Sequence, residues 1–331
     1  MVAVKKLKVG LTYDLRDDYL KEGYSPEEIA EFDFPGTIDA LEKAILAKGY
    51  QTDRIGNIKS LVRRLATGDR WDLVFNIAEG MHGFGREAQV PAILDAYNIP
   101  YTFSDPLGQS LGLHKSMAKH IVRDLGIPTP DFAVVESAKD LSRLNLPYPV
   151  FAKPIAEGTG KGITSLSKIT SRRELDEVCR NILQNFKQPV LVETYLPGRE
   201  FTVGILGSGK DARALGVLEI LLNPSAEKNA YSYENKERCE SLVQYILVND
   251  KEARLAMDTA MRVWRALNLK DAGRVDLRSD ATGIPNFMEV NPLAGLNPSH
   301  SDLPILCTQL GISYNELISS IIESALKRVN N

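Results

Sequence analysis

Short apolar runs and amphipathic stretches alternate over the first third of the chain. Residues 7–13 and 73–77 are apolar runs of strand length. After Gly36, apolar side chains recur at spacings of three and four residues until Gly49, which is the pattern of one buried helix face. A further helical stretch covers residues 88–97. This alternation predicts an open, mostly parallel sheet covered by helices, an α/β arrangement.

The pattern changes after residue 114. Residues 150–154 and 190–193 are apolar runs, and the glycine-bearing stretch 157–162 follows the first of them. Ser171 begins a Ser-Arg-Arg-Glu capping box, and helical periodicity continues after it. We therefore expect a small α+β unit of mixed helices and strands in this part of the chain.

From residue 201 the apolar runs follow one another like the strands of an antiparallel sheet. Residues 201–206 and 214–221 are separated by a short polar, glycine-bearing turn. Residues 273–277 and 286–290 form a second pair of strand-like runs. Between the pairs, residues 223–249 are polar and irregular over a length that favours a functional loop.

The composition narrows the classes of function. The 331 residues carry 40 Lys and Arg against 43 Asp and Glu, which gives a net charge of −3. This balance argues against a general binder of nucleic acid or of anionic membranes, because such proteins need a basic excess. No apolar run approaches the roughly 18 residues that span a bilayer, and the N-terminus lacks a signal-peptide pattern. The three cysteines lie far apart and the four histidines are scattered, which predicts neither disulfides nor a zinc site. We expect a cytoplasmic protein.

The strongest candidate for chemistry is a pair of strands that carry polar residues at alternate positions. Arg274 and Asp276 share one side of the first strand, and Glu289 and Asn291 share one side of the second. If the strands pair, two carboxylates and an amide oxygen gather beside a guanidinium, and such hard oxygen ligands suit Mg²⁺. A half-exposed sheet face with a surface ion pair shows the same alternation, so both interpretations stay open. The alternate residues are apolar and are expected to pack into the core: Val275, Met288 and Val290.

A second candidate is Lys153, which lies inside an apolar strand. A buried lysine needs an anion to offset its desolvation, and the glycine-rich turn 157–162 offers backbone N–H groups that suit phosphate. The stretch is not a P-loop, and no GxGxxG motif opens a helix after a strand. A plain hairpin turn is the alternative.

A third candidate is the stretch after the strand at residues 73–77. Asn76, Glu79 and His82 lie where open α/β sheets hold their ligands. The glycines that follow could equally make this stretch an ordinary turn.

The order of these features resembles the ATP-grasp superfamily and, within it, the D-alanine–D-alanine ligases. The resemblance covers roughly residues 72–328. It is carried by Lys115, by Lys153 with its glycine loop, by Glu-Thr-Tyr-Leu-Pro-Gly-Arg-Glu-Phe-Thr-Val from Glu193, by Arg274-x-Asp276, and by Glu289-x-Asn291-Pro-Leu-Ala-Gly295.

The resemblance implies an ATP-grasp fold of three domains. These would be an N-terminal α/β substrate domain (residues 1–114), a small central α+β domain (115–197) and a C-terminal antiparallel-sheet domain (198–331). ATP would lie between the last two domains, with Mg²⁺ as its metal and Mn²⁺ as an alternative ion. A homodimer is expected by analogy.

For ATP, the resemblance implies two lysines on the phosphates, a small loop over them, a hinge at the adenine, a carboxylate on the ribose and a lysine from a larger mobile loop. These are, in turn, Lys115 and Lys153; Glu157, Gly158, Thr159 and Gly160; Glu193, Thr194, Tyr195 and Leu196; Glu200; and Lys236. We also assign Met288 to the nucleotide site.

For catalysis, the resemblance implies metal ligands and groups that bind the substrates. The metal ligands would be Asp276, Glu289 and Asn291, and Arg274 would stabilise the tetrahedral intermediate. The catalytic set is completed by the acceptor-binding Ser301 with the Gly295 backbone, and by Glu79 on the first-substrate side.

The N-terminal region departs from the D-alanine–D-alanine ligase pattern. The family's Gly-Gly-x-Ser-x-Glu turn, whose glutamate holds the first ammonium, is replaced by residues 12–16, and an acidic segment through Asp33 is added. Glu79 stands where the family has histidine, and Glu237 stands where many members have tyrosine. Asp14, Arg16 and Glu79 therefore mark a rewritten first-substrate side.

We expect an ATP-dependent ligase that joins a small-molecule carboxylate to an amine, with amino acids as the expected substrates, through an acyl phosphate. One alternative is a ligase of the same fold for another amino acid, a dipeptide or a specialised-metabolite acid. The other is a nucleotide-binding module that does not ligate, although such a module need not keep Arg274.

Overall fold

Three sheets organise the computed structural model, which describes residues 6–227, 234–235 and 238–329. The N-terminal sheet is parallel with strand order β2-β1-β3, and the other two sheets are antiparallel. This arrangement confirms the predicted fold class, with a parallel sheet in the first part of the chain, a small α+β unit after it and an antiparallel sheet in the last part. No helix in the described part of the chain is both long and apolar enough to cross a membrane.

The N-terminal sheet consists of β1 (Lys8–Thr12), β2 (Gln51–Gly56) and β3 (Leu73–Asn76). Its helices alternate with the strands as the apolar pattern predicts. They are α1 (Arg16–Lys21), α2 (Pro35–Ala47), α3 (Ile58–Ala66), α4 (Gln89–Ala96) and α5 (Pro106–Leu113).

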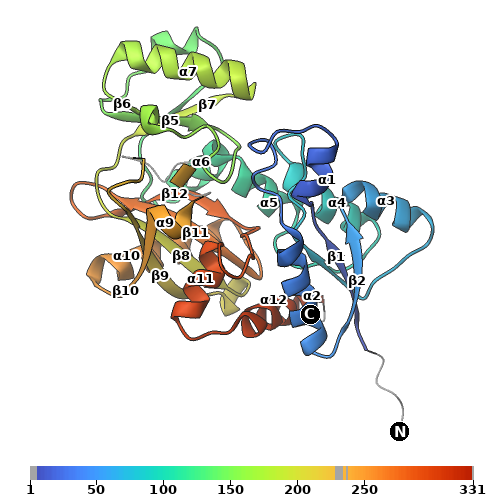
Figure 1. Cartoon of the computed structure of the whole chain (residues 1–331). Coiled ribbons are helices and arrows are strands. Elements are labelled where there is room, and N and C mark those ends of the chain that lie inside the picture. The colour runs from blue at the N-terminus through green and yellow to red at the C-terminus, as the bar shows by residue number, and fades with distance from the viewer. Residues whose placement is uncertain (1–5, 228–233, 236–237, 330–331) are drawn as a thin grey trace.

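The central sheet has the order β4-β7-β5-β6 and carries a helix on one side. Figure 1 shows it with α7 as a lobe at the top of the molecule. Its strands are β4 (Phe132–Val135), β5 (Val150–Pro154), β6 (Lys168–Ile169) and β7 (Val190–Thr194), and its helix is α7 (Arg172–Phe186). Helix α6 (Lys115–Asp124) lies where the three parts meet (Figure 1).

The largest sheet has the order β10-β9-β8-β11-β12. It consists of β8 (Glu200–Leu206), β9 (Arg213–Leu222), β10 (Val243–Val248), β11 (Ala272–Ser279) and β12 (Pro285–Asn291). The helices in this part of the chain are α9 (Cys239–Leu242), α10 (Lys251–Ala266), α11 (Asp302–Gln309) and α12 (Tyr314–Val329).

Helix α10 covers one face of the largest sheet. Its apolar stripe packs with Val275 and Leu277 of β11 in one buried cluster. Because neighbouring residues of a strand point to opposite faces, Arg274 and Asp276 lie on the other face. The face of the sheet opposite α10 therefore carries the polar side chains of β11.

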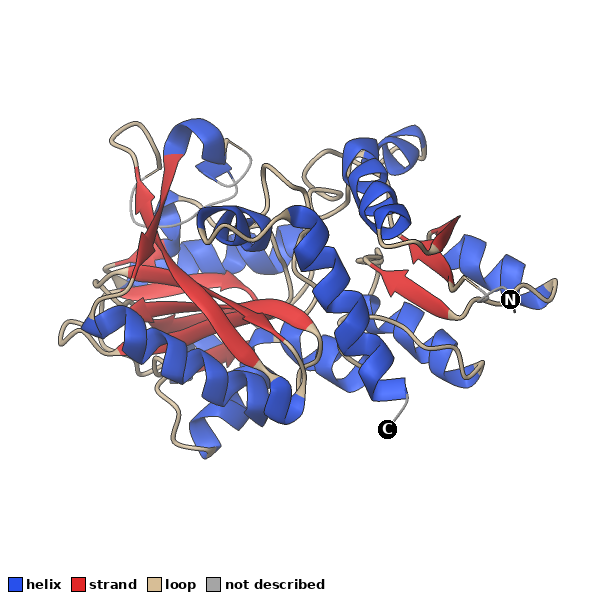
Figure 2. Ribbon diagram, turned by 90° about the horizontal axis from the view of Figure 1, so that it is seen from below, coloured by secondary structure: helices blue, strands red, loops and turns tan. Residues whose placement is uncertain are grey.

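The end of the chain packs against the beginning. Ile318, Ile321 and Ile322 of α12 share one buried cluster with Leu41 of α2 and Val9 of β1. Figure 2 shows α12 between the largest sheet and the parallel sheet. The last helix is thus part of the core of the N-terminal unit.

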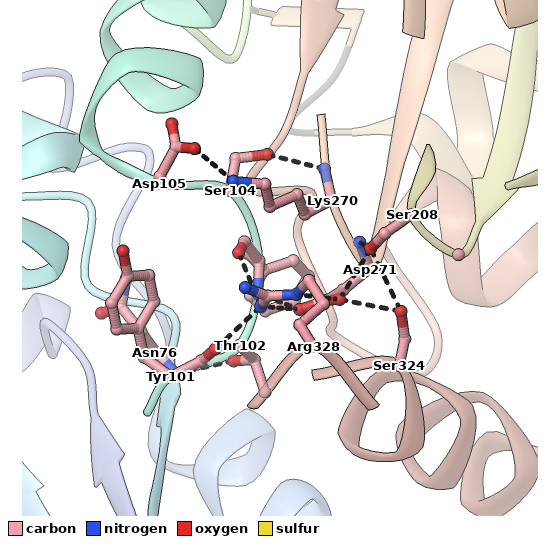
Figure 3. A network of polar contacts seen from close by, with 12 residues as sticks. Asn76, Tyr101, Thr102, Ser104, Asp105, Ser208, Lys270, Asp271, Ser324 and Arg328 are labelled. Carbon is pink, nitrogen blue, oxygen red and sulfur yellow. Dashed lines mark hydrogen bonds and ion pairs between the residues drawn. The ribbon is translucent and has the colours of Figure 1, made fainter. Parts of the chain in front are cut away.

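A buried polar network strengthens this junction (Figure 3). Asp271 is fully buried just before β11 and lies 2.6 Å from the Arg328 guanidinium of α12. It also accepts hydrogen bonds from the Ser324 hydroxyl (2.8 Å) and from the backbone N–H of Phe103 (2.8 Å). One carboxylate therefore joins segments of the chain that are far apart in the sequence.

Candidate active site

Two adjoining cavities lie between the three sheets. The hinge cavity, of about 80 Å³, is lined by Lys153, Thr194, Tyr195, Leu196, Glu200, Thr202, Asp276, Arg278 and Met288, among others. The acidic cavity, of about 150 Å³, is lined by residues that include Asp33, Glu79, Glu87, Lys115, Gly158, Thr159, Arg274, Asn291, Gly295 and Ser301. Glu157 and Glu289 line both cavities, so these two residues mark their junction.

The hinge cavity brings together most of the residues that the resemblance assigns to ATP. Thr194, Tyr195 and Leu196 follow β7 along one wall, and Glu200 begins β8 beside them. Arg278 of β11 donates to Glu200 (3.3 Å) and to the Tyr195 hydroxyl (3.1 Å). These bonds fix the hinge residues and the carboxylate against the same guanidinium.

The position of Met288 differs from the one that the alternation of side chains along a strand predicts. The pairing of β11 with β12 sets Asp276 opposite Glu289 and Leu277 opposite Phe287, so Met288 is the extra residue of a β-bulge. The bulge interrupts the alternation, and Met288 lines the hinge cavity instead of entering the core. The expected core position of Met288 was therefore wrong.

Glu193 is not one of the residues that line the hinge cavity. Its buried carboxylate lies between Lys153 of β5 (2.9 Å) and Lys119 of α6 (3.0 Å). Burial raises the pKa of Glu193, but the two lysines outweigh it and hold the pKa below its usual value. The side chain thus supports Lys153, and only the neighbouring hinge residues face the cavity.

Lys119 is a functional neighbour that the sequence did not single out. It is fully buried and also donates to the Phe287 carbonyl and the Thr129 hydroxyl (3.0 Å each). Burial lowers its pKa to about 8 despite the nearby Glu193. Its position on a helix with no special motif gives no sequence signal, whereas Lys153 stands out because it interrupts an apolar strand.

The predicted metal ligands gather on one face, at the edge shared by the two cavities. Asp276 and Glu289 lie directly opposite each other in the β11–β12 register, and so do Arg274 and Asn291. Asp276 accepts a hydrogen bond from the Thr202 hydroxyl (2.9 Å) and one from the Asn291 amide (3.3 Å), and it forms an ion pair with Arg274. Two carboxylates beside an amide are a donor set that fits Mg²⁺. The half-exposed sheet face with a mere surface ion pair does not describe this arrangement, because Asp276 is 9% exposed.

Cations offset these carboxylates from two sides. Lys115 lies 3.5 Å from Glu289 and donates to the carbonyl of Glu157. Arg274 also lies 3.5 Å from Asp302 at the start of α11. Burial lowers the pKa of Lys115, whereas the carboxylates around Arg274 outweigh burial and raise its pKa. Arg274 therefore keeps a permanent positive charge inside the acidic cavity.

Gly295 and Ser301 form the predicted acceptor side of the acidic cavity. A Cβ at Gly295 would lie 2.7 Å from the Ser301 hydroxyl, so glycine permits this close approach. The Ser301 hydroxyl accepts a hydrogen bond from the Asn297 backbone N–H (3.0 Å), and Ser301 precedes α11. Both residues lie in the same cavity as Arg274.

The first-substrate side differs from the prediction at Asp14, which is not one of the residues that line the acidic cavity. Asp14 accepts hydrogen bonds from the Tyr19 hydroxyl (2.6 Å) and from the backbone N–H of Gly80 (2.9 Å). Glu79 does line the cavity, as expected, together with Asp33 and Glu87. The sequence missed Glu87 because an acidic residue near a short helix is ordinary.

The small glycine-rich loop is held by the added acidic segment. Glu31 accepts a hydrogen bond from the Gly158 backbone N–H (2.6 Å) and forms ion pairs with Lys161 (3.2 Å) and Arg86 (2.9 Å). Burial raises the pKa of Glu31, but the two cations outweigh it and lower the pKa to about 2. The segment and the loop are therefore joined by charge.

The prediction for Lys236 falls outside the described structure. Lys236, predicted to approach the γ-phosphate, lies outside the described residues. His300 lines the acidic cavity, and its Nδ1 lies 3.5 Å from the Cys239 sulfur and 3.1 Å from Glu240. Hydrogen bonds to Cys239 and Glu240 raise the pKa of His300 to about 9, although burial opposes them.

Comparisons with known proteins place the chain in a family. A family model described as the D-ala D-ala ligase C-terminus matches residues 121–323. A D-alanine–D-alanine ligase of Bordetella avium is 34% identical over 74% of this chain and 76% of its own length. A protein of Sinorhizobium fredii, named only as uncharacterized protein y4sG, is 33% identical over 77% of this chain and 75% of its own length.

The fold agrees as well. The crystal structure of a D-alanine–D-alanine ligase from Bacillus anthracis complexed with ATP matches with a TM-score of 0.75 over 99% of each chain, at 21% identity. The chain belongs to the D-alanine–D-alanine ligase family, whose members are ATP-dependent, ADP-forming ligases with the ATP-grasp fold.

Proposed function

We propose that the protein forms an amide bond between two amino acids by way of an acyl phosphate. The observation that carries the proposal is the position of Arg274, Asp276, Glu289 and Asn291 at the edge shared by the two cavities. A nucleotide in the hinge cavity would point its phosphates toward this edge. A carboxylate in the acidic cavity would meet them there.

Charge neutralisation is the first task of the site. A carboxylate and a triphosphate repel each other, so their approach needs fixed positive charges. Lys153 and Lys115 would hold the phosphates, and Mg²⁺ bound by Asp276, Glu289 and Asn291 would neutralise further phosphate charge. Glu193 and Lys119 keep Lys153 in place.

The attack of the amine is the second task. The attack creates an oxyanion on the former carboxyl carbon, and Arg274, one of the cations that line the acidic cavity, would stabilise it. Loss of a preorganised donor of this kind typically raises the barrier by about 3–4 kcal/mol. The small loop over residues 157–162 would exclude water, which otherwise hydrolyses the acyl phosphate.

The Asp276→Asn and Glu289→Gln variants test this function. Each replaces a charged ligand by a neutral one of similar shape, so we expect ADP release in the presence of amino acids to be abolished while the circular dichroism spectrum is kept. Asp258→Asn, on the exposed side of α10, is the matched control and should keep wild-type turnover. Wild-type turnover in both site variants would remove the proposed role of these carboxylates.

A further inference from the structure

We propose that the first amino acid carries a second positive charge on its side chain, as a diamino acid does. The inference rests on the proposed function and names the substrate class of the acidic cavity. It starts from one wall of that cavity, which consists of Asp33, Glu79 and Glu87. We call these three residues the acidic wall.

The acidic cavity has cations on one side and carboxylates on the other. Arg274 and Lys115 lie on the side of the metal ligands, and the acidic wall comes from the N-terminal unit. An amino acid would therefore place its carboxylate toward Arg274 and Lys115, where it can be phosphorylated. Its ammonium group would face the acidic wall.

The acidic wall carries three carboxylates, and Arg16 lines the same cavity and offsets the charge of Asp33, so Glu79 and Glu87 are the two carboxylates that a ligand would meet. The nearby Glu31 and Glu157 are already paired, since Arg86 lies 2.9 Å from Glu31 and Lys161 lies 2.6 Å from Glu157. Within the described residues, by contrast, the carboxylates of Glu79 and Glu87 make no hydrogen bond and no ion pair. Glu87 is 8% exposed and borders the cavity.

A buried carboxylate without a partner is costly, so such a group either takes up a proton or binds a cation. Burial raises the pKa of Glu87 to about 7 although Arg86 opposes it, and burial together with the charge of Glu87 raises the pKa of Glu79 well above its usual value. Burial and Asp14 raise the pKa of Asp33 to about 7, although Arg16 opposes them. A ligand with two cationic groups would satisfy this wall.

The lost turn of the family pattern supports the same conclusion. That turn holds one ammonium with one glutamate. In the equivalent stretch of this chain, Asp14 instead accepts hydrogen bonds from the Tyr19 hydroxyl and the Gly80 backbone N–H. Asp14 does not line the acidic cavity, whereas Glu79 and Glu87, which follow β3 in the chain, do. Recognition has thus moved from one carboxylate to a group of them.

Matched pairs of amino acids test the inference, because each pair differs only in a terminal ammonium or methyl group. The pairs are 2,3-diaminopropionate with 2-aminobutyrate, 2,4-diaminobutyrate with norvaline, and ornithine with norleucine, each as both enantiomers. Binding to the full-length protein is measured by calorimetry with Mg²⁺ and a non-hydrolysable ATP analogue. We expect the cationic member of at least one pair to bind about tenfold more tightly.

The Glu87→Gln variant should reduce this preference, while Glu323→Gln, an exposed control on α12, should keep it. Neutral members that bind as well as the cationic ones in every pair would overturn the inference, and so would an unchanged preference in Glu87→Gln. ADP release is measured separately with the same amino acids and with alanine. Its absence in every case counts against the proposed ligase, whereas strong release with alanine beside equal binding within all pairs rejects only the diamino acid.

Discussion

The carboxyl group of Glu87 is buried and makes no hydrogen bond or ion pair within the described residues, although the charges that act on it include Arg86, Lys115 and Lys161. Its folded-state pKa is raised from 4.5 to about 7 by burial, with Glu31 adding to the shift and Arg86 opposing it. Between these two values the folded protein binds more protons than the unfolded chain. Stability without ligand therefore falls as the pH rises from about 4.5 to about 7.

The Glu87→Gln variant should remove this loss. We expect its free energy of unfolding to exceed that of the wild type at pH 8, by an amount on the order of 1–3 kcal/mol. The gain should be smaller at pH 5, where the wild-type carboxyl is protonated in the folded state. Urea unfolding at both pH values measures it, and an equal gain at the two pH values or a loss at pH 8 would contradict the account.

The sequence predicted individual residues well where a strand pattern makes them conspicuous. Lys153 interrupts an apolar strand, and Asp276 and Glu289 alternate with apolar neighbours, so their common face could be predicted. Met288 could not, because a β-bulge is decided by the pairing of two strands rather than by either one. Glu87 could not either, since only the fold shows that its charge lacks a partner.

At the scale of elements, the small loop and the added acidic segment act together. Glu31 of the segment accepts a hydrogen bond from the backbone N–H of Gly158. Arg86, which pairs with Glu31, also donates a hydrogen bond to the Ala156 carbonyl (2.9 Å). A Cβ at Gly158 would lie only 2.3 Å from the Glu31 carboxylate. The contact that orders the loop therefore depends on glycine at this position.

Gly158→Ala should separate the loop from the segment without removing a charge. We expect amide hydrogen exchange over residues 155–163 to become about tenfold faster, as loss of a charge-assisted hydrogen bond implies, and the KM for ATP to rise. Gly36→Ala is the matched control, because a Cβ there has no atom within 4 Å. Unchanged exchange in Gly158→Ala would show that Glu31 does not hold the loop.

At the scale of the whole molecule, the three units predicted from the apolar pattern appear as three sheets, but the division is not linear along the chain. Helix α12 follows the largest sheet and yet packs with α2 and β1. Periodicity reports that a helix has a buried face and does not report which partner covers it. The exact domain boundaries and the homodimer stay predictions.

The junction around Asp271 should contribute strongly to stability. Arg328→Ala removes the cation from a fully buried carboxylate that keeps only hydrogen bonds, so we expect a loss of about 3 kcal/mol in the free energy of unfolding. Lys327→Ala, one residue away and 71% exposed, is the control and should change stability little. Chemical denaturation compares the two, and equal effects would mean that the network of Figure 3 is not a structural junction.

The central claim is that ATP activates a carboxylate as an acyl phosphate in the acidic cavity. Its most direct test is to supply a first amino acid in which both carboxyl oxygens are ¹⁸O and to examine the released phosphate by ³¹P NMR. Phosphorylation of the carboxylate followed by attack of the amine at carbon leaves one substrate oxygen on phosphate, so the account predicts one ¹⁸O in each phosphate released during ligation. Phosphate free of ¹⁸O, with the amide product still formed, would contradict it.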